Sequence, residues 1–320
     1  MSQALSEFDL IARYFDVPAL KGSEDNPFIS LSIGDDCALL QPTPHHQLAV
    51  SVDTLVSGIH FPVNVPPKLL AWRSLAVSVS DLAAMGATPK GFTLALTLPE
   101  ANSDWLASFA SGLAEAAQHY GVVLFGGDTT KGPLAISVQV FGEVPSGLAL
   151  RRDGANIGDA VFVSGELGGA HVALDYLADE ATNQDPLVDQ LLQAYYKPDA
   201  AIALGQALRG VASAAVDISD GLLADLGHIA SRSGLSITVH SHLIPVHPAV
   251  SALCNKDRAL AAATKGGDDY QLAFCVPESK IQDLLALPFN LTRIGTCKSG
   301  AGVLLDDQHI LSGGFQHFEV

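Results

Sequence analysis

Aspartates gather in six short segments of this 320-residue chain, and each segment also carries glycine, serine or threonine. These small neighbours let the backbone turn sharply, and the hydroxyl groups add further oxygen ligands. Short carboxylates in such settings suit Mg²⁺, which takes hard oxygen ligands and leaves positions for water or phosphate oxygens. The segments are Ile33-Gly-Asp-Asp36, Ser51-Val-Asp-Thr54, Ser80-Asp-Leu-Ala-Ala-Met-Gly86, Gly126-Gly-Asp-Thr-Thr130, Asp217-Ile-Ser-Asp-Gly221 and Gly266-Gly-Asp-Asp269.

Any one of these segments is more typical of an ordinary turn or helix N-cap, because Asp and Gly are the commonest turn residues. Six of them together favour a shared role. If the segments converge, their carboxylates repel one another unless cations are bound, so convergence predicts a metal site. Carboxylates also repel phosphate and serve it through bridging Mg²⁺, which makes phosphoryl transfer the predicted chemistry.

The common nucleotide-binding motifs are missing from the chain. It has no G-x-x-x-x-G-K-[ST] loop, no G-x-G-x-x-G fingerprint and no protein-kinase H-R-D loop. A nucleotide site would therefore use metal ions and a few cations. Lys131, Arg151 and Arg152 are the candidates, and each is equally compatible with a solvated surface charge.

Composition excludes several classes of protein. The 17 Lys and Arg against 34 Asp and Glu give a formal net charge of −17, which argues against non-specific nucleic-acid binding. Hydrophobic residues make up 48% and charged residues 16%, which argues against disorder. We expect no membrane span and no signal peptide, and hence a cytoplasmic protein. The four cysteines have no metal-ligand spacing and are expected to be buried hydrophobes.

The elements that must position these acids alternate between strands and helices. Strands are expected over 48–53, with Asp53 at the end, and over 91–98, 122–125 and 134–141. Helices are expected over 68–84 and 104–120, the second with an apolar stripe of Trp105, Phe109 and Leu113. The Gly126–Thr130 segment would form a turn after its strand.

The pattern breaks near residue 148, where we expect a domain boundary between 1–148 and 149–320. The second half predicts strands over 160–163, 214–218, 236–239, 271–275 and 291–294, and helices over 170–178, 187–195, 200–208 and 222–232. Strict alternation of strand and helix is not sustained, so the sequence favours two mixed α+β domains over one doubly wound sheet.

Taken together, Ile33-Gly-Asp-Asp-Cys-Ala-Leu39, Asp53-Thr-Leu-Val-Ser-Gly-Ile-His-Phe61, Ser80-Asp-Leu-Ala-Ala-Met-Gly-Ala87, Gly126-Gly-Asp-Thr-Thr130, Asp217-Ile-Ser-Asp-Gly-Leu222 and Gly266-Gly-Asp-Asp-Tyr270 resemble the thiamine-monophosphate kinase family. The match runs nearly from end to end. The Asp-x-x-Asp-Gly and Gly-Asp-Asp elements alone would indicate only the wider aminoimidazole ribonucleotide synthetase-like superfamily. The segments around Asp53 and Asp81 are more specific to the thiamine enzymes.

The resemblance implies an ATP-dependent kinase that converts thiamine phosphate to thiamine diphosphate by direct in-line transfer, the last step of thiamine diphosphate biosynthesis. It implies a homodimer whose N-terminal sheets pair into a barrel. Residues 1–148 would bind ATP and Mg²⁺ and mediate dimerisation, and residues 149–320 would close the active site. We expect no nucleic-acid or membrane partner.

The family's site residues carry over motif by motif, and they include no covalent or general-base residue. The metal ligands for several Mg²⁺ ions would be Asp36, Ser51, Val52, Asp53, Asp81, Asp128, Asp217 and Asp220. The ATP contacts would be Gly127, Asp128, Arg152 and Ser219, and the thiamine phosphate contacts His60, Asp268 and Phe315.

Three positions depart from the family pattern. Asp268 replaces the usual Glu, which shortens the substrate-side carboxylate by one methylene. Val52 offers only its backbone carbonyl to a metal ion. Phe315 lacks the polar group of a Tyr or Trp, so it could stack on a ring but not hydrogen-bond, and taken alone it is more typical of a core residue.

Two other functions stay open from sequence. One is another ATP-dependent synthetase of the same superfamily that acts on a different acceptor. The other is a nucleotide- or thiamine-binding protein without turnover, although every metal aspartate is present. The remaining histidines, including His45, His240, His242 and His247, lie in loop-like contexts and are interpreted as surface residues.

Overall fold

The computed structural model describes residues 7–22, 26–178, 184–309 and 314. The chain divides into two compact units, each treated by itself below. The first comprises Met1–Leu82 and Ala87–Gly147, and the second comprises Ala83–Gly86 and Leu148–Val320.

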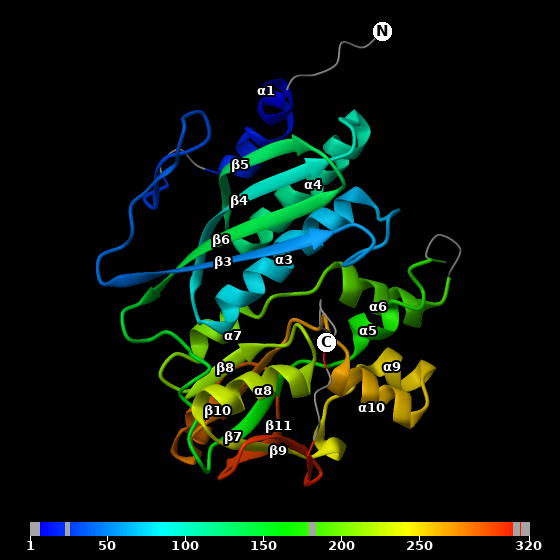
Figure 1. Cartoon of the computed structure of the whole chain (residues 1–320). Coiled ribbons are helices and arrows are strands. Elements are labelled where there is room, and N and C mark those ends of the chain that lie inside the picture. The colour runs from blue at the N-terminus through cyan, green and yellow to red at the C-terminus, as the bar shows by residue number, and fades with distance from the viewer. Residues whose placement is uncertain (1–6, 23–25, 179–183, 310–313, 315–320) are drawn as a thin grey trace. The chain divides into compact units, whose positions relative to one another are not determined.

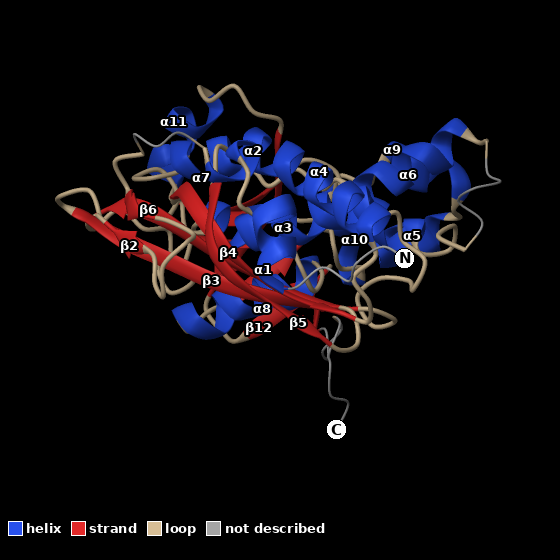
Figure 2. Cartoon of the chain, turned by 90° about the horizontal axis from the view of Figure 1, so that it is seen from above, coloured by secondary structure: helices blue, strands red, loops and turns tan. Residues whose placement is uncertain are grey.

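The first unit is built on a four-stranded sheet in the order β3-β6-β4-β5. β3 (His46–Val56) and β4 (Thr88–Leu98) both pair antiparallel with β6 (Ala135–Pro145). β5 (Val123–Lys131) runs parallel to β4, and α4 (Ser103–Tyr120) connects the two. α3 (Pro67–Ala84) and α4 lie on the same face of this sheet (Figures 1 and 2).

Short elements precede this sheet in the chain. They are α1 (Glu7–Leu10), a π-helical turn η1 (Ile11–Phe15), α2 (Pro18–Lys21), β1 (Ile29–Leu31) and β2 (Leu39–Leu40). Phe28 and Ile29 pack on Phe125 of β5 as a small satellite core. These segments border the β5 edge of the sheet and build one wall of the cavity described below.

Local signals explain why α4 begins and ends where it does. The Asn102 side chain accepts hydrogen bonds from the backbone N–H groups of Asp104 and Trp105, and Gly121 ends the helix in the left-handed conformation. Phe109 and Leu113 are fully buried, and Trp105 stacks on Phe109 with 4.9 Å between ring centroids. The predicted helix over 104–120 is confirmed.

The second unit contains a seven-stranded sheet in the order β13-β12-β9-β11-β7-β10-β8. Its neighbouring strands are antiparallel except for the parallel pair β12 and β9. The strands are β7 (Ala160–Ser164), β8 (Ala214–Asp217), β9 (Ser236–Val239), β10 (Leu272–Val276), β11 (Leu291–Lys298), β12 (Gly302–Leu305) and β13 (Gln308–His309).

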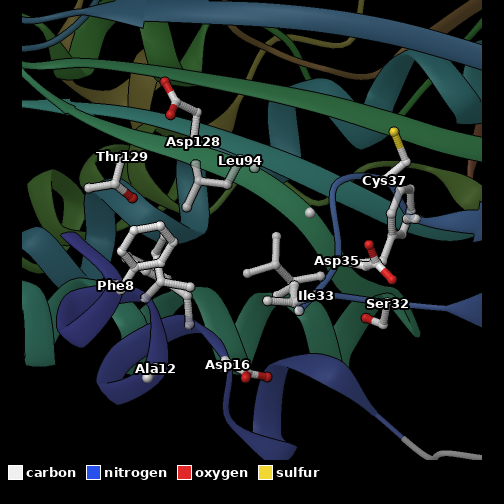
Figure 3. Close-up of a pocket in the computed structure, with 18 of the residues that line it drawn as sticks. Phe8, Ala12, Asp16, Ser32, Ile33, Asp35, Cys37, Leu94, Asp128 and Thr129 are labelled. Atoms are coloured by element: carbon white, nitrogen blue, oxygen red, sulfur yellow. The ribbon is translucent and has the colours of Figure 1, made fainter.

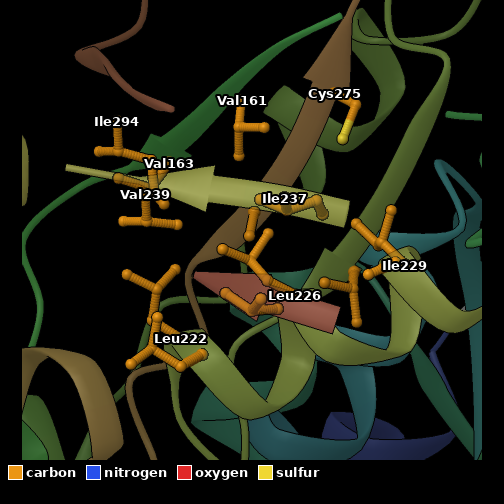
Figure 4. Close-up of a cluster of buried hydrophobic side chains, with 14 of the residues drawn as sticks. Val161, Val163, Leu222, Leu226, Ile229, Ile237, Val239, Cys275 and Ile294 are labelled. Carbon is orange, nitrogen blue, oxygen red and sulfur yellow. The ribbon is translucent and has the colours of Figure 1, made fainter. Parts of the chain in front are cut away.

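The core of this unit forms where α8 (Leu222–Ser233) packs on the sheet. Leu222, Leu226 and Ile229 of α8 face Ile237 and Val239 of β9 (Figure 4). The other helices are α5 (Gly169–Ala173), α6 (Pro186–Tyr196), α7 (Ile202–Ala207), η2 (Ser241–Leu243), α9 (Pro248–Leu253), α10 (Lys256–Lys265), η3 (Glu278–Lys280) and α11 (Ile281–Leu285). Both units are therefore mixed α and β, as predicted.

Several sequence expectations were wrong in detail. β3 continues to Val56, so Asp53 lies inside the strand, and β5 continues to Lys131, so the Gly126–Thr130 segment is strand and not a turn. Cys275 and Cys297 are buried as expected, but Cys37 is exposed. Among the described residues, none of the helices has the length and apolar character needed to cross a membrane.

Candidate functional site

Three of the predicted metal ligands meet where β3 faces α3. Along β3, Ser51 and Asp53 are partly buried on the α3 side, whereas Val52 points to the opposite face. Asp81 lies in the last turn of α3 and accepts a short hydrogen bond from the Ser51 hydroxyl. The strand alternation therefore brings Ser51, Asp53 and Asp81 together, and it leaves Val52 only its backbone carbonyl as a possible ligand.

The electrostatics of this group disfavour a second negative charge. Burial and, to a smaller extent, the nearby Asp81 carboxylate raise the pKa of Asp53 to about 6, against the opposing effect of a hydrogen bond from Ser78. The Asp53 Oδ2 atom is buried and has no hydrogen-bond partner among the described residues. A cation beside this oxygen would relieve both the repulsion and the missing contact, and the surrounding donors are all oxygen atoms, as Mg²⁺ requires.

A second group of predicted residues lines a cavity of about 700 Å³ in the same unit. Asp35 and Asp36 reach it from the loop after β1, and Gly127 and Asp128 reach it from β5. Phe8 and Ile33 supply apolar walls, with Asp128 at one end of the space and Asp35 at the other (Figure 3). An apolar space rimmed by carboxylates and bare backbone can take a flat ring and a metal-bound phosphate chain.

Gly127 keeps the floor of this cavity open. A Cβ atom at this position would lie 2.0 Å from the Leu94 carbonyl oxygen of β4. Real atoms do not approach so closely, so a side chain here would force β4 and β5 apart. The glycine therefore permits close strand contact and exposes its own backbone to the cavity.

These two groups of acids lie at opposite edges of one sheet. β3 and β5 are the outer strands, with β6 and β4 between them. The pairings place Asp128 level with Ala95, Ser137 and Thr54, one residue from Asp53. With three strand spacings between them, the β3 and β5 acids are about 14 Å apart in backbone position. Within the first unit, therefore, Asp53 and Asp128 are not brought together.

In the second unit, Asp217 ends β8, and the loop that follows holds Ser219 and Asp220. The buried Asp225 carboxylate of α8 organises this loop, because its Oδ2 accepts hydrogen bonds from three successive backbone N–H groups, those of Ser219, Asp220 and Gly221, at 3.0–3.1 Å. Burial and the nearby Asp217 and Asp220 carboxylates raise the pKa of Asp225 to about 7, against those N–H donors. Asp220, Asp225 and His228 also offer ligand atoms within 4.8 Å of one another.

The segment around Asp268 runs alongside this loop. The Asp268 N–H donates to the Ser219 carbonyl at 2.8 Å, and the Tyr270 N–H donates to the Ile218 carbonyl at 2.8 Å. Asp268 has a left-handed φ of 72°, and its carboxylate accepts a hydrogen bond from the Tyr270 hydroxyl at 3.0 Å. The predicted substrate carboxylate thus lies beside the predicted metal loop, and its orientation is fixed by Tyr270.

The remaining predicted residues are placed individually. His60 lies in the loop after β3, where its Nδ1 accepts from the Val56 N–H at 2.9 Å. Arg152 is exposed, whereas the adjacent Arg151 pairs with Asp153 and is accounted for by that ion pair. Lys131 is exposed at the end of β5. Phe315 lies outside the described residues.

Sequence reasoning missed Asp225 and the apolar walls of the cavity. Asp225 follows Gly221 by four residues in the first turn of α8, a spacing that signals a carboxylate reaching back to free N–H groups. Phe8, in contrast, belongs to a four-residue helix with no distinctive pattern, so no sequence signal marked it.

Comparison with known families matches both units. The N-terminal domain of AIR synthase related proteins matches residues 34–144, and the C-terminal domain of the same proteins matches residues 156–301. These two matches define a two-domain protein of the AIR synthase-related class.

Within this class, the chain is 44% identical to thiamine-monophosphate kinase of Escherichia coli (strain K12) over 276 residues, which covers 86% of this chain and 84% of the relative. The chain belongs to the thiamine-monophosphate kinase family and is a kinase.

Solved structures agree with this placement. The crystal structure of thiamine-monophosphate kinase from Stenotrophomonas maltophilia K279a matches with a TM-score of 0.84 and 44% identity, and covers 89% of this chain and 93% of that one. A structure of AaThiL complexed with AMPPCP and TMP matches with a TM-score of 0.81 and 33% identity, and covers 87% of this chain and 89% of that one.

Proposed function

We propose that this chain transfers the terminal phosphoryl group of ATP to the phosphate of thiamine monophosphate and so forms thiamine diphosphate. The observation that carries the proposal is membership of the thiamine-monophosphate kinase family. The chain also carries the aspartates that the resemblance assigns to the metal ions, namely Asp36, Asp53, Asp81, Asp128, Asp217 and Asp220. The binding of the ATP analogue AMPPCP and of TMP by the related AaThiL supports the same pair of substrates.

The transfer needs no general base from the protein. The acceptor is a phosphate monoester whose second pKa is about 6, so its oxygen is already anionic near neutral pH. The chain therefore has to position two anionic substrates in line and offset their mutual repulsion. Direct attack of the acceptor oxygen on the γ-phosphorus then releases ADP, without a covalent phosphoenzyme.

The acidic residues fit a set of Mg²⁺ ions, which when bound would neutralise phosphate charge and align the oxygens. Ser51, Asp53 and Asp81 are a preassembled oxygen donor set, and the Asp53 Oδ2 atom is available for a cation. In the second unit, the ligands would be Asp217, at the end of β8, and Asp220, on the loop that Asp225 holds in place. The Val52 carbonyl would complete the set on β3.

The nucleotide would occupy the cavity between Phe8, Ile33 and β5. Gly127 and Asp128 would face the phosphate chain, and the apolar walls would accept the base. Ser219 and Arg152 would add a hydrogen-bonding group and a positive charge for the phosphates. On the acceptor side, His60, Asp268 and Phe315 would contact thiamine phosphate.

The proposal includes a homodimer whose N-terminal sheets pair into a barrel. β3 is an edge strand, and it carries an apolar row of Leu48, Val50 and Val52 with exposed fractions of 44, 50 and 59%. An edge with apolar side chains is a template for pairing with another chain, so a second copy is the natural partner.

Residues 1–148 would then serve ATP binding and dimerisation, and residues 149–320 would close the active site. The proposed location is the cytoplasm, which supplies the ATP.

Product analysis tests the proposal directly. Purified protein is incubated with ATP, thiamine monophosphate and Mg²⁺, with parallel reactions that omit Mg²⁺ or replace the acceptor by free thiamine. We expect equal amounts of ADP and thiamine diphosphate in the complete reaction only. ADP without thiamine diphosphate would contradict the proposal, because the phosphoryl group would then have been transferred to water and the true acceptor would have to be sought among other compounds.

A further inference from the structure

The end of α3, the helix that carries Asp81, is held by residues that lie far from the metal ligands in the sequence. Ala83–Gly86 belong to the second compact unit, whereas Asp81 belongs to the first. Ala83 and Ala84 are buried in the core of the second unit together with Leu204 of α7. Because Asp81 comes only two positions before Ala83 in the same helix, the placement of this helix end determines where the Asp81 side chain begins.

The helix ends in a closed hydrogen-bonded turn. The Gly86 N–H donates to the Ala83 carbonyl at 2.9 Å, and the Ala87 N–H donates to the Leu82 carbonyl at 2.8 Å. With Gly86 at a left-handed φ of 64°, these two bonds make the Schellman arrangement that ends many helices. The turn is therefore a rigid end piece, and a push on it moves the whole last turn of α3.

Gly205 of α7 packs directly against this end piece. A Cβ atom at Gly205 would lie 2.1 Å from the Ala83 carbonyl oxygen and 2.9 Å from the carbonyl carbon. A Cβ atom at Gly86 would in turn lie 3.0 Å from the Gly205 carbonyl oxygen. Since the atoms in the way are backbone atoms that cannot rotate aside, a side chain at Gly205 would push the end of α3 away from α7.

Two hydrogen bonds fasten the same contact. Arg209, four positions after Gly205, donates from its Nε atom to the Gly86 carbonyl at 2.5 Å. The Leu150 N–H donates to the Met85 carbonyl at 3.1 Å. Both carbonyls lie at the C-terminal end of α3, where carbonyl groups lack partners within the helix and a cation is favourable. The second unit thus holds the end of α3 by one charged side chain, one backbone group and one close backbone contact.

We propose that Gly205 and Arg209 are positioning residues for phosphoryl transfer, because they fix the end of α3 and with it the place of Asp81 among the oxygen donors of Ser51 and Asp53. The proposal rests on the proposed function, since it takes Asp81 as a ligand for Mg²⁺. Asp81 accepts its hydrogen bond from the Ser51 hydroxyl only while the helix end stays in place. A displacement of about 1 Å would open this donor set, and such a misplacement can lower activity about a hundredfold.

Two pairs of variants separate positioning from stability. Gly205→Ala forces the clash, and its matched control is Gly227→Ala, at a glycine of α8 where a Cβ atom would meet no described atom within 4 Å. Arg209→Ala removes the hydrogen bond to Gly86, whereas Arg209→Lys keeps a cation that can reach the same carbonyl. Thermal unfolding and circular dichroism establish the temperature below which each variant is folded, and all kinetic measurements are made there.

Two readouts report on the metal ligands rather than on the fold. The first is the rise in melting temperature that Mg²⁺ causes without nucleotide, compared with Asp53→Asn, which lacks one ligand. The second is formation of thiamine diphosphate at varied Mg²⁺. We expect Gly205→Ala and Arg209→Ala to lose most of this rise and to need about ten- to a hundredfold more Mg²⁺ for half-maximal rate, with an unchanged KM for thiamine monophosphate. Arg209→Lys should recover most of both properties, and Gly227→Ala should match the wild type.

A lower melting temperature with an unchanged Mg²⁺-dependent rise and an unchanged Mg²⁺ requirement would overturn the proposal, because the contact would then serve the fold alone. The proposal is also overturned if Mg²⁺ stabilises the wild type no more than Asp53→Asn, since Asp81 would then hold no ion. Failure of the proposed function has a different signature, because wild-type protein would form no thiamine diphosphate. If Gly205→Ala does not fold, the comparison of Arg209→Ala with Arg209→Lys decides the question.

Discussion

Asp53 is a carboxylate that the metal-free protein holds at a cost. Its folded pKa of about 6 lies above the value of 3.8 expected for the unfolded chain, because burial and Asp81 disfavour its ionised form. The folded state therefore binds more protons between about pH 4 and pH 6, and stability falls as pH rises through this window. Above about pH 6 the ionised Asp53 lowers the stability by the full amount, unless a cation offsets its charge.

We predict that Asp53→Asn stabilises the metal-free protein at pH 7.5 by on the order of 1–2 kcal/mol and has little effect at pH 4. The same variant should lose kinase activity, and Mg²⁺ should stabilise the wild type more than the variant. Urea unfolding with EDTA or with Mg²⁺ at the two pH values measures the changes in stability, and formation of thiamine diphosphate measures the activity. Glu100→Gln, at an exposed carboxylate, is the control. A variant no more stable than wild type at pH 7.5 would contradict this account.

At the scale of the element, the loop between β8 and α8 depends on one side chain that sequence motifs pass over. Asp225 satisfies three N–H groups that would otherwise lack partners at the start of α8. A buried donor left unsatisfied costs about 1–3 kcal/mol. The position of Ser219 and Asp220 therefore depends on a residue that need not touch any substrate.

We predict that Asp225→Ala lowers the free energy of unfolding by about 2–3 kcal/mol and kcat/KM at least a hundredfold, because three N–H groups lose their acceptor. Asp225→Asn keeps one carbonyl acceptor, so it should retain more of the stability and more of the activity than Asp225→Ala does. Chemical unfolding and steady-state kinetics with varied Mg²⁺ measure the two effects.

Asn102→Ala is the control for Asp225→Ala, because it should lower the stability without changing the position of the acidic residues. Loss of this N-cap should cost about 1 kcal/mol in α4 and leave kcat/KM unchanged. If Asp225→Ala lost stability but kept full activity, the loop would not need Asp225 for its geometry.

Elements with local signals could be predicted from the sequence, and those set by distant partners could not. The observed ends of α4 lie within one residue of the predicted ones, because local signals mark this helix: Asn102 before it, Gly121 after it, and the stripe of Phe109 and Leu113 along it. The extension of β3 past Asp53 instead depends on β6, roughly 80–100 residues later, whose Ile136 and Ala135 pair with Leu55 and Val56.

The candidate site shows the same division. The acids could be recognised by type and spacing, and Asp81 lies in the helix expected over 68–84. Asp128 instead lies in a strand and not in the expected turn, because the ladder with β4 overrides the turn tendency of Gly126 and Gly127. The role of Asp225 is local, since its partners are only four to six residues away, and its spacing could have indicated it. The walls of the cavity that Phe8 and Asp128 line emerge only when segments distant in sequence pack together.

At the scale of the whole molecule, the apolar row on β3 is expected to govern association. We predict that Val50→Glu converts the proposed homodimer to a monomer, because a charge would be buried at the centre of the proposed interface. Sedimentation velocity measures the mass, and circular dichroism checks the fold. Val63→Glu, at an exposed apolar residue outside β3, is the control. A dimeric Val50→Glu variant would place the interface elsewhere.

The pairing of β3 with β6 also bears on synthesis of the chain. His46 and Val56, at the two ends of β3, pair with Pro145 and Ala135. At about 5–20 residues per second, β3 leaves the ribosome roughly 5–20 seconds before its partner strand exists. For that time an apolar strand with both edges unpaired is exposed to neighbouring nascent chains on the same message. Rapid translation would therefore favour insoluble product, and slower translation or chaperone capture of residues 46–56 should increase the yield of folded protein.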